Sequence, residues 1–355
     1  MDKAWMKKIG SLAIVLGAAG LLWFWSSHST DVRENRDGAE HGFFAMDTYF
    51  TVNAYGIGCE EAVLEAEEET KRLEQLLSVT VPESDLWRIN HAHGQPVAVD
   101  GDTISVLTEA VAMGALTQGA LDISVYPVLQ AWGFTVSGEE EFQIPSEQKL
   151  RELLISVDYQ KVQIGETAVS VPDGMQIDLG AIAKGYTGDQ LTELFRSRGI
   201  TSALLNLGHN VQTIGERPDG TPWKIGVTDP FEPQEILGVV ELTDKVVITS
   251  GNYERYFEKD GRRYCHILDP ATGHPAQSGL VSVTVIGESG TYCDALSTAI
   301  FVMGREKGVS LWREQGDFEL ILVEEDGSVF ITEGLRDCFL PESGHEVTEV
   351  LERVG

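Results

Sequence analysis

Residues 175–186, MQIDLGAIAKGY, decide how the rest of this 355-residue sequence is interpreted. The alternation at 175–177 predicts the end of a strand, followed by a glycine turn and a helix. Gly180 lets the backbone approach a ligand closely, and the first N–H groups of the helix lack internal partners. One interpretation is a nucleotide site, with Lys184 on a phosphate and Asp178 on a hydroxyl or ring N–H. The other is a capped amphipathic helix with a solvated lysine, and this stretch alone does not choose between them.

The charge balance limits the possible partners. The chain has 26 Lys and Arg residues against 56 Asp and Glu residues, a formal net charge of −30. A nucleic-acid-binding protein needs a basic surface, so this composition argues against a nucleic-acid partner. The net field would also repel an anionic small ligand, which must therefore be met locally by a metal, a lysine or backbone N–H groups.

The first 27 residues are expected to be a membrane anchor or a signal segment. Lys3, Lys7 and Lys8 precede an apolar run over residues 9–25. The basic side normally stays in the cytosol, so we expect the rest of the chain to lie outside the cell membrane. The run is near the lower length limit of a spanning helix, which leaves a cleaved signal peptide open, and we favour an uncleaved anchor.

No strong linker divides the remaining chain. We expect a linker over residues 28–42, one large domain over residues 43–340 and a tail over residues 341–355. Strand-like alternation mixed with amphipathic helices indicates an α+β fold, a single large mixed α/β domain after the N-terminal hydrophobic helix. The four cysteines form no C-x-x-C motif, which argues against a structural zinc site, while one disulfide outside the cytosol stays possible.

Two further segments carry candidate chemistry. In CHILDPATGHP, residues 265–275, His266 lies where a predicted strand runs into an Asp-Pro turn. In YCDALSTAIFVMG, residues 292–304, an apolar helix places Asp294 and Thr298 at positions i and i+4 on one face. Such hard oxygens suit Mg²⁺, which takes few protein ligands and completes its shell with water and substrate phosphates. Taken alone, however, the pair is better explained by a polar residue at a helix start and a threonine bonded to its own backbone.

Residues 119–134, GALDISVYPVLQAWGF, indicate the wall of a pocket. Asp122 is the one carboxylate in this otherwise apolar segment. An aspartate before Ile-Ser-Val most often caps a turn or a helix, so its role stays open from the sequence.

Together these segments resemble the FAD:protein FMN transferase (ApbE) family. The similarity runs from about residue 44 to residue 304, and its most specific parts are MQIDLGAIAKGY, CHILDPATGHP and the D-x-x-x-T of CDALST, in that order. The resemblance implies a T-fold-like mixed α/β domain that binds FAD with Mg²⁺ and acts outside the cytoplasmic membrane, often tethered to it. Such enzymes cleave the FAD pyrophosphate, attach FMN through a phosphoester bond to a Thr or Ser of a partner protein, and release AMP.

The resemblance also implies roles for individual residues. The carbonyl of Ala181 and the side chains of Asp294 and Thr298 would hold Mg²⁺, and His266 is the candidate base. The residues that would bind FAD are Met46, Thr80, Ala120, Leu121, Asp122, Asp178, Lys184 and Ile267.

The sequence departs from the family pattern at three places. Residues 46–48 read Met-Asp-Thr where the family usually has Met-Gly-Thr, and Thr80 replaces an aromatic residue often found in its loop. Both changes would affect FAD affinity or pose. Ser297 stands where some members have a second carboxylate near the metal, which implies weaker metal binding.

The implied chemistry is consistent with these residue types. Mg²⁺ and Lys184 would offset the charge of the pyrophosphate and stabilise the AMP leaving group. His266, with a pKa near the working pH, would take the proton of the acceptor hydroxyl. The acceptor would be another chain, either a membrane redox subunit or an extracytoplasmic flavoprotein, because no self-acceptor segment is evident. The alternatives are an FAD pyrophosphatase using the same site and a flavin-binding protein without turnover.

Overall fold

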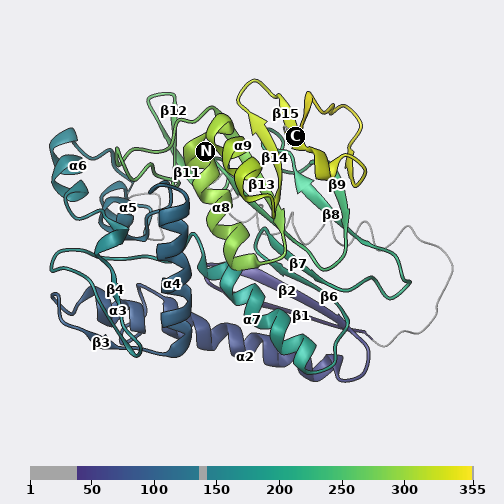
Figure 1. Ribbon diagram of the computed structural model, residues 1–355, viewed down its shortest axis with the longest axis horizontal. Helices are drawn as coiled ribbons and strands as arrows, with labels where there is room; N and C mark the ends of the chain where they lie inside the picture. Colours follow the sequence, from purple (N-terminus) through teal and green to yellow (C-terminus); the bar gives the residue numbers. More distant parts are fainter. Residues whose placement is uncertain (1–37, 136–141, 354–355) are drawn as a thin grey trace, which may run out of the picture. The chain divides into compact units, whose positions relative to one another are not determined.

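A nine-stranded sheet is the centre of the computed structural model, which describes residues 38–135 and 142–353 (Figure 1). Neighbouring strands pair antiparallel, except the parallel pair β15–β17. In spatial order the strands are β1 (Gly38–Ala45), β2 (Thr48–Tyr55), β6 (Ser202–Leu207), β7 (Asn210–Ile214), β10 (Val246–Gly251), β13 (Leu280–Gly287), β14 (Glu319–Glu324), β15 (Val329–Thr332) and β17 (Glu349–Leu351). The expected mixed α/β class with a large sheet is confirmed.

Both faces of this sheet are covered. On β10, Val246 and Ile248 pack into the core shared with the helices, whereas Val247 packs against a second, three-stranded sheet. The helices on the first face are α2 (Cys59–Leu77), α7 (Ala183–Ser197), α8 (Gly290–Met303) and α9 (Arg305–Gln315). The small sheet on the other face has the order β16 (Phe339–Pro341), β9 (Ile236–Leu242) and β8 (Trp223–Thr228). Strand β13 is buried along its whole length because both layers cover it.

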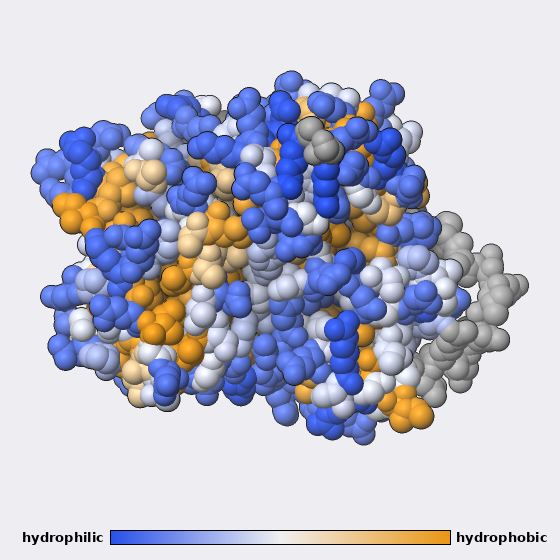
Figure 2. Space-filling model, in the orientation of Figure 1, coloured by the Kyte–Doolittle hydropathy of each residue, from blue (hydrophilic) through white to orange (hydrophobic). Residues whose placement is uncertain are grey.

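A further group of short elements extends the helical side. It consists of α3 (Asp85–Asn90), β3 (Val97–Ala98), α4 (Gly101–Leu116), η1 (Ile123–Val125), α5 (Tyr126–Trp132), α6 (Glu147–Leu154), η3 (Tyr159–Lys161), β4 (Gln163–Ile164) and β5 (Ala168–Ser170). A small core centred on Trp132 joins α5 and α6 to Leu268. Figure 2 shows a mostly hydrophilic surface with apolar residues gathered around α5 and α6, where Ile155 is 77% exposed.

The sheet extends past both expected domain borders. Strand β1 begins at Gly38, within the expected linker, and β17 lies within the expected C-terminal tail. The residues expected to form the anchor lie outside the described residues. Within the described ranges, no helix is long and apolar enough to cross a membrane.

The strand expected at residues 175–177 does not form. This segment is extended, but a side chain takes the place of a neighbouring strand: the Asn90 amide accepts from Ile177 N (2.8 Å) and donates to Ile177 O (2.9 Å). Asp178 N then donates to Ile123 O (2.8 Å), which fixes the segment beside the turn at residues 119–125. The alternating pattern therefore predicted the extended backbone correctly but not its partner.

The β1–β2 connection explains one departure from the family pattern. Met46 and Asp47 form the two-residue turn and both have positive φ, 48° and 60°. Such turns favour Gly, Asn and Asp, because other side chains are strained there. Aspartate tolerates this backbone better than most residues, so Asp47 can replace the usual glycine without changing the turn.

Candidate functional site

Helices α7 and α8 cross at glycines, and this crossing fixes Asp294. A Cβ on Gly185 would lie 2.1 Å from the carbonyl oxygen of Gly290, so only glycine permits the contact. At the crossing, Gly185 N donates to Asp294 Oδ2 (2.8 Å). The carboxylate is thereby held beside the first turn of α7, the turn that follows Ala181.

Asp189 holds the same two helices together from the other side. It lies on α7, and its carboxylate accepts from Gly290 N (2.6 Å), Thr291 N (2.9 Å), Thr291 Oγ1 (2.7 Å) and Ser289 Oγ (2.9 Å). A carboxylate at a helix N-terminus satisfies N–H groups that would otherwise lack partners. Asp189 therefore fixes the start of α8 and, one turn later, Asp294.

The polar face of α8 offers oxygen ligands to a cation. Asp294 is only 4% exposed, and within the described residues no Lys, Arg or His forms an ion pair with it. Thr298 Oγ1 lies 3.3 Å from Ser250 Oγ, which also contacts Ser297 Oγ (2.8 Å). A buried carboxylate without a cationic partner calls for a counter-charge, so this donor set fits Mg²⁺. In the chain as described, no three or more His, Cys, Asp and Glu side chains gather in a metal-binding arrangement, so neutral oxygens would have to complete the set.

Lys184, in the first turn of α7, is the electrostatic centre of the site. Burial raises the pKa of Asp178, while its hydrogen bond from Gly180 N (2.8 Å) and the Lys184 charge oppose that rise. Burial also raises the pKa of Glu254 to about 7, with Lys184 lowering it and Asp294 raising it further. Lys184 therefore acts on acidic groups from two segments, Asp178 and Glu254.

The charge of Lys184 also acts on His209, which lies near Glu254. Their nearest polar atoms are 3.9 Å apart, and their side chains are 60% and 22% exposed. Surrounding protein nevertheless lowers the pKa of His209, and the Lys184 charge lowers it further.

His266 carries one fixed ring proton. Its Nδ1 lies 3.1 Å from Arg255 O, and a carbonyl only accepts, so Nδ1 must donate. Nε2 is then the unprotonated nitrogen, the form that a base requires. Burial lowers the pKa of His266 to about 4, the bond to Arg255 O raises it, and the charges of Arg255 and Lys184 lower it. The expected pKa near the working pH is therefore wrong for the free protein.

Asp122 acts as a cap. Its Oδ1 accepts from Ser124 N (2.8 Å) and Ser124 Oγ (2.5 Å), and its Oδ2 accepts from Tyr159 N (3.0 Å). Both oxygens are engaged, so any ligand at this turn would meet the backbone of Ala120 and Leu121 more readily than the carboxylate. Capping is the common role of an aspartate in this pattern, and the sequence alone had left the role of Asp122 open.

The other expected FAD-binding residues lie in different surroundings. Met46 is tied to α7 by Thr187, whose hydroxyl lies 3.7 Å from Met46 Sδ. Ile267 is buried next to His266, and Cys265 and Cys293 are buried thiols rather than a disulfide. Thr80 is exposed, and its side chain contacts Ser78 Oγ (3.1 Å).

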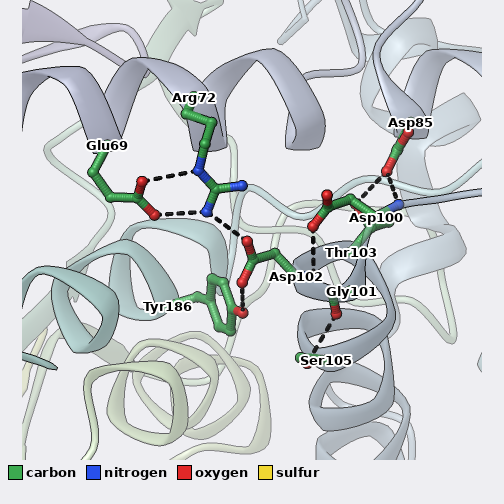
Figure 3. Close-up of polar contacts among 9 residues, drawn as sticks. All are labelled: Glu69, Arg72, Asp85, Asp100, Gly101, Asp102, Thr103, Ser105 and Tyr186. Carbon is green, nitrogen blue, oxygen red and sulfur yellow. Dashed lines mark hydrogen bonds and ion pairs between the residues drawn. The ribbon is translucent and has the colours of Figure 1, made fainter. Parts of the chain in front are cut away.

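A polar network anchors the far side of α7 (Figure 3). Tyr186 donates to Asp102 on α4 (2.6 Å), and Arg72 on α2 joins Asp102 (2.5 Å) to Glu69 (2.6 Å). The phenol hydrogen bond and the Arg72 charge lower the pKa of Asp102 against the effect of burial. The network thus orients the helix whose first turn carries Lys184.

Sequence reasoning missed Asp189, His209, Glu254 and Arg255. Asp189 is five residues after Lys184 and could have been found as a polar residue on a mostly buried helix face. Glu254 and Arg255 lie in SGNYERY, which the pattern indicated only as a connection between strands.

Comparisons with known proteins point to one family. The model of the ApbE family matches residues 46–322. A FAD:protein FMN transferase of Klebsiella pneumoniae is 36% identical over 285 residues, 79% of this chain and 87% of that protein. One of Escherichia coli K12 is 30% identical, covering 81% of this chain and 84% of that protein. The crystal structure of the ApbE protein of Thermotoga maritima superposes with a TM-score of 0.80 at 36% identity, covering 85% of this chain and 99% of that one. The flavin transferase ApbE of Vibrio cholerae gives a TM-score of 0.77 at 26% identity, with the same coverage.

Proposed function

The chain belongs to the ApbE family, and from this membership we propose that it is a flavin transferase. It cleaves the pyrophosphate of FAD, attaches FMN through a phosphoester bond to a Thr or Ser of a separate protein, and releases AMP. The observation that carries the proposal is the position of Lys184: the next residue, Gly185, donates to Asp294 (2.8 Å), and the Lys184 charge acts on His266. These residues would supply a cation, a metal-ligating oxygen and a base. The names of the curated relatives support the same reaction.

FAD is proposed to lie across the start of α7. Lys184 binds a phosphate, and Asp178, whose pKa is raised by burial, binds a hydroxyl or a ring N–H. The nucleotide is lined by Met46 and Ile267. The segment Ala120–Leu121–Asp122 lines it through its backbone, and Thr80 lies on the rim of the site. The dipole of α7 also favours a phosphate there, because a helix N-terminus attracts negative charge.

Mg²⁺ is proposed to be held by Asp294, Thr298 and the carbonyl of Ala181. The supporting observation is the buried Asp294 carboxylate, which has a backbone N–H but no cationic side chain as its partner. When bound, the ion supplies positive charge that offsets the pyrophosphate. Since one carboxylate contributes to this set, binding is expected to be weaker than at a two-carboxylate site.

His266 is proposed to take the proton of the acceptor hydroxyl through Nε2. In the free protein burial, with the charges of Arg255 and Lys184, lowers the pKa of His266 to about 4, which makes the imidazole a weak base. A bound pyrophosphate would offset these two charges and raise the pKa of His266 toward the working pH. The base is therefore strengthened by the substrate that it serves.

We propose that the enzyme acts outside the cytoplasmic membrane, held there by residues 1–27. The basic flank and apolar run of that segment support this location. The acceptor would then be an extracytoplasmic flavoprotein or a membrane redox subunit.

The test is incubation with FAD, Mg²⁺ and a candidate acceptor protein, followed by quantification of AMP and mass spectrometry of the acceptor. Labelled acceptor with an equal amount of AMP supports transfer. Free FMN without labelled protein would favour a pyrophosphatase, and retained FAD without AMP would favour a flavin-binding protein. The variant Asp294→Ala should remain folded and release no AMP; wild-type rates in this variant, or with a chelator present, would refute the metal assignment.

A further inference from the structure

One buried donor lies within the site and has no partner. In the described part of the chain, the buried side-chain atoms without a hydrogen-bond partner are Glu65 Oε2, Asn210 Nδ2, Trp312 Nε1 and Glu319 Oε2. The two glutamates still form ion pairs through their other oxygen, and Trp312 lies on α9, which carries no candidate site residue. Asn210 is only 2% exposed, so water does not compensate for the missing bond.

The strand register places Asn210 between the residues of the sheet that contact α7 and α8. Asn210 begins β7, pairs with Ile248 of β10, and shares the helix-covered face with Gln212 two residues later. Gln212 donates to Gly185 O (3.3 Å), at the start of α7. Two residues beyond Ile248, Ser250 contacts Thr298 of α8. The unpartnered amide therefore lies on the helix-covered face of the sheet, next to the two helix segments that carry Lys184 and Thr298.

An unsatisfied buried donor costs folding free energy, and few persist in native proteins without a reason. An apolar side chain of similar shape would remove this cost, so a retained asparagine suggests a partner that is absent from the free protein. Gln212 provides the contrast, since its amide also accepts from Thr192 Oγ1 (3.0 Å) and is satisfied without any ligand.

We infer that Asn210 donates a hydrogen bond through Nδ2 to a phosphoryl oxygen of the FAD pyrophosphate, an inference that rests on the proposed function. The acceptor is anionic because the Lys184 ammonium lies close by, where its charge lowers the pKa of His209, the residue before Asn210. An amide suits this position because it adds a directional donor and no charge that would need a counter-ion in the free protein. Nδ2 is closed to water, so a neighbouring side chain must move when the ligand enters. His209, the preceding residue, is the candidate for this movement because its side chain is 60% exposed.

The test uses Asn210→Val, which has nearly the same volume and no polar atoms. Without FAD, its unfolding midpoint should be about 2 °C or more above that of the wild type, because the unsatisfied donor is gone. Its affinity for FAD, measured by quenching of flavin fluorescence, should fall about tenfold to a hundredfold. The matched variant Gln212→Leu should instead lower the midpoint, since it removes satisfied bonds.

A lower midpoint or a failure to fold in Asn210→Val would overturn the inference, because it would show that the amide already has a partner, such as an ordered water. Unchanged FAD affinity would overturn it as well. ADP and riboflavin are the separate probes: loss of ADP affinity with riboflavin binding intact supports the phosphoryl contact, and the reverse pattern refutes it. A wild-type protein that binds no FAD would instead refute the proposed function.

Discussion

Replacing Gly185 by alanine should disable the site by forcing α7 and α8 apart. The new Cβ would lie 2.1 Å from Gly290 O, 2.5 Å from Gly290 C and 2.7 Å from Asp294 Cβ. Two of these atoms are backbone, so no rotamer change relieves the clash. Separation to the 3.0 Å that real Cβ contacts respect requires a shift of about 0.9 Å.

This shift has a cost in stability and a larger one in catalysis. Overpacking of a buried contact costs about 1–3 kcal/mol, and loss of the bond from Gly185 N to the buried Asp294 carboxylate costs about 1–3 kcal/mol more. We therefore expect the free energy of unfolding to fall by about 2–6 kcal/mol. A displacement near 1 Å at a catalytic group can cost about a hundredfold in rate, so AMP release should fall by at least that factor.

Chemical denaturation and AMP release from FAD measure the two effects. Gly101→Ala is the matched control, because a Cβ at Gly101, the first residue of α4, meets no atom within 4 Å. Its stability should be unchanged or higher by up to about 1 kcal/mol. Wild-type stability and rate in Gly185→Ala would refute the claim that this crossing fixes Asp294.

Three further outcomes are expected. His266→Ala should slow FMN transfer while FAD still binds in a fluorescence titration; a near-normal rate would exclude His266 as the base. The acid limb of kcat/KM should lie near pH 4, where free His266 becomes protonated, and the limb of kcat should lie at higher pH because bound substrate raises this pKa; coincident limbs would contradict that effect. Glu254 has a raised pKa of about 7, so its ionisation lowers stability as the pH rises from about 4.5 through 7. Glu254→Gln should accordingly raise the unfolding midpoint relative to wild type at pH 8 but not at pH 4, and an equal difference at both pH values would disprove the assignment.

The sequence predicted those parts of the fold that depend on local periodicity. Residues 292–304 formed the expected helix because their pattern is helical throughout, and Asp294 and Thr298 share a face on it. Residues 175–177 are extended as expected, yet the partner is the side chain of Asn90, 87 positions earlier. No window of neighbouring residues contains that information.

The residues of the candidate site also divide into those that local sequence predicts and those that it does not. Lys184 and His266 belong to contiguous motifs and could be named from the sequence. Asp189 and Asn210 could not, because their importance lies in what they contact, or fail to contact, across the fold. The pKa of His266 was also beyond prediction, since burial and the charges of Arg255 and Lys184 set it.

The order of the central sheet has a consequence for engineering. Strand β1 is one edge and β17 is the other, so the first and last strands of the described chain are separated by eight strand spacings. At about 4.8 Å each, that is about 38 Å measured along the sheet. A circular permutant would therefore need a joining peptide of at least about 11 extended residues, and a shorter one should pull an edge strand out of register.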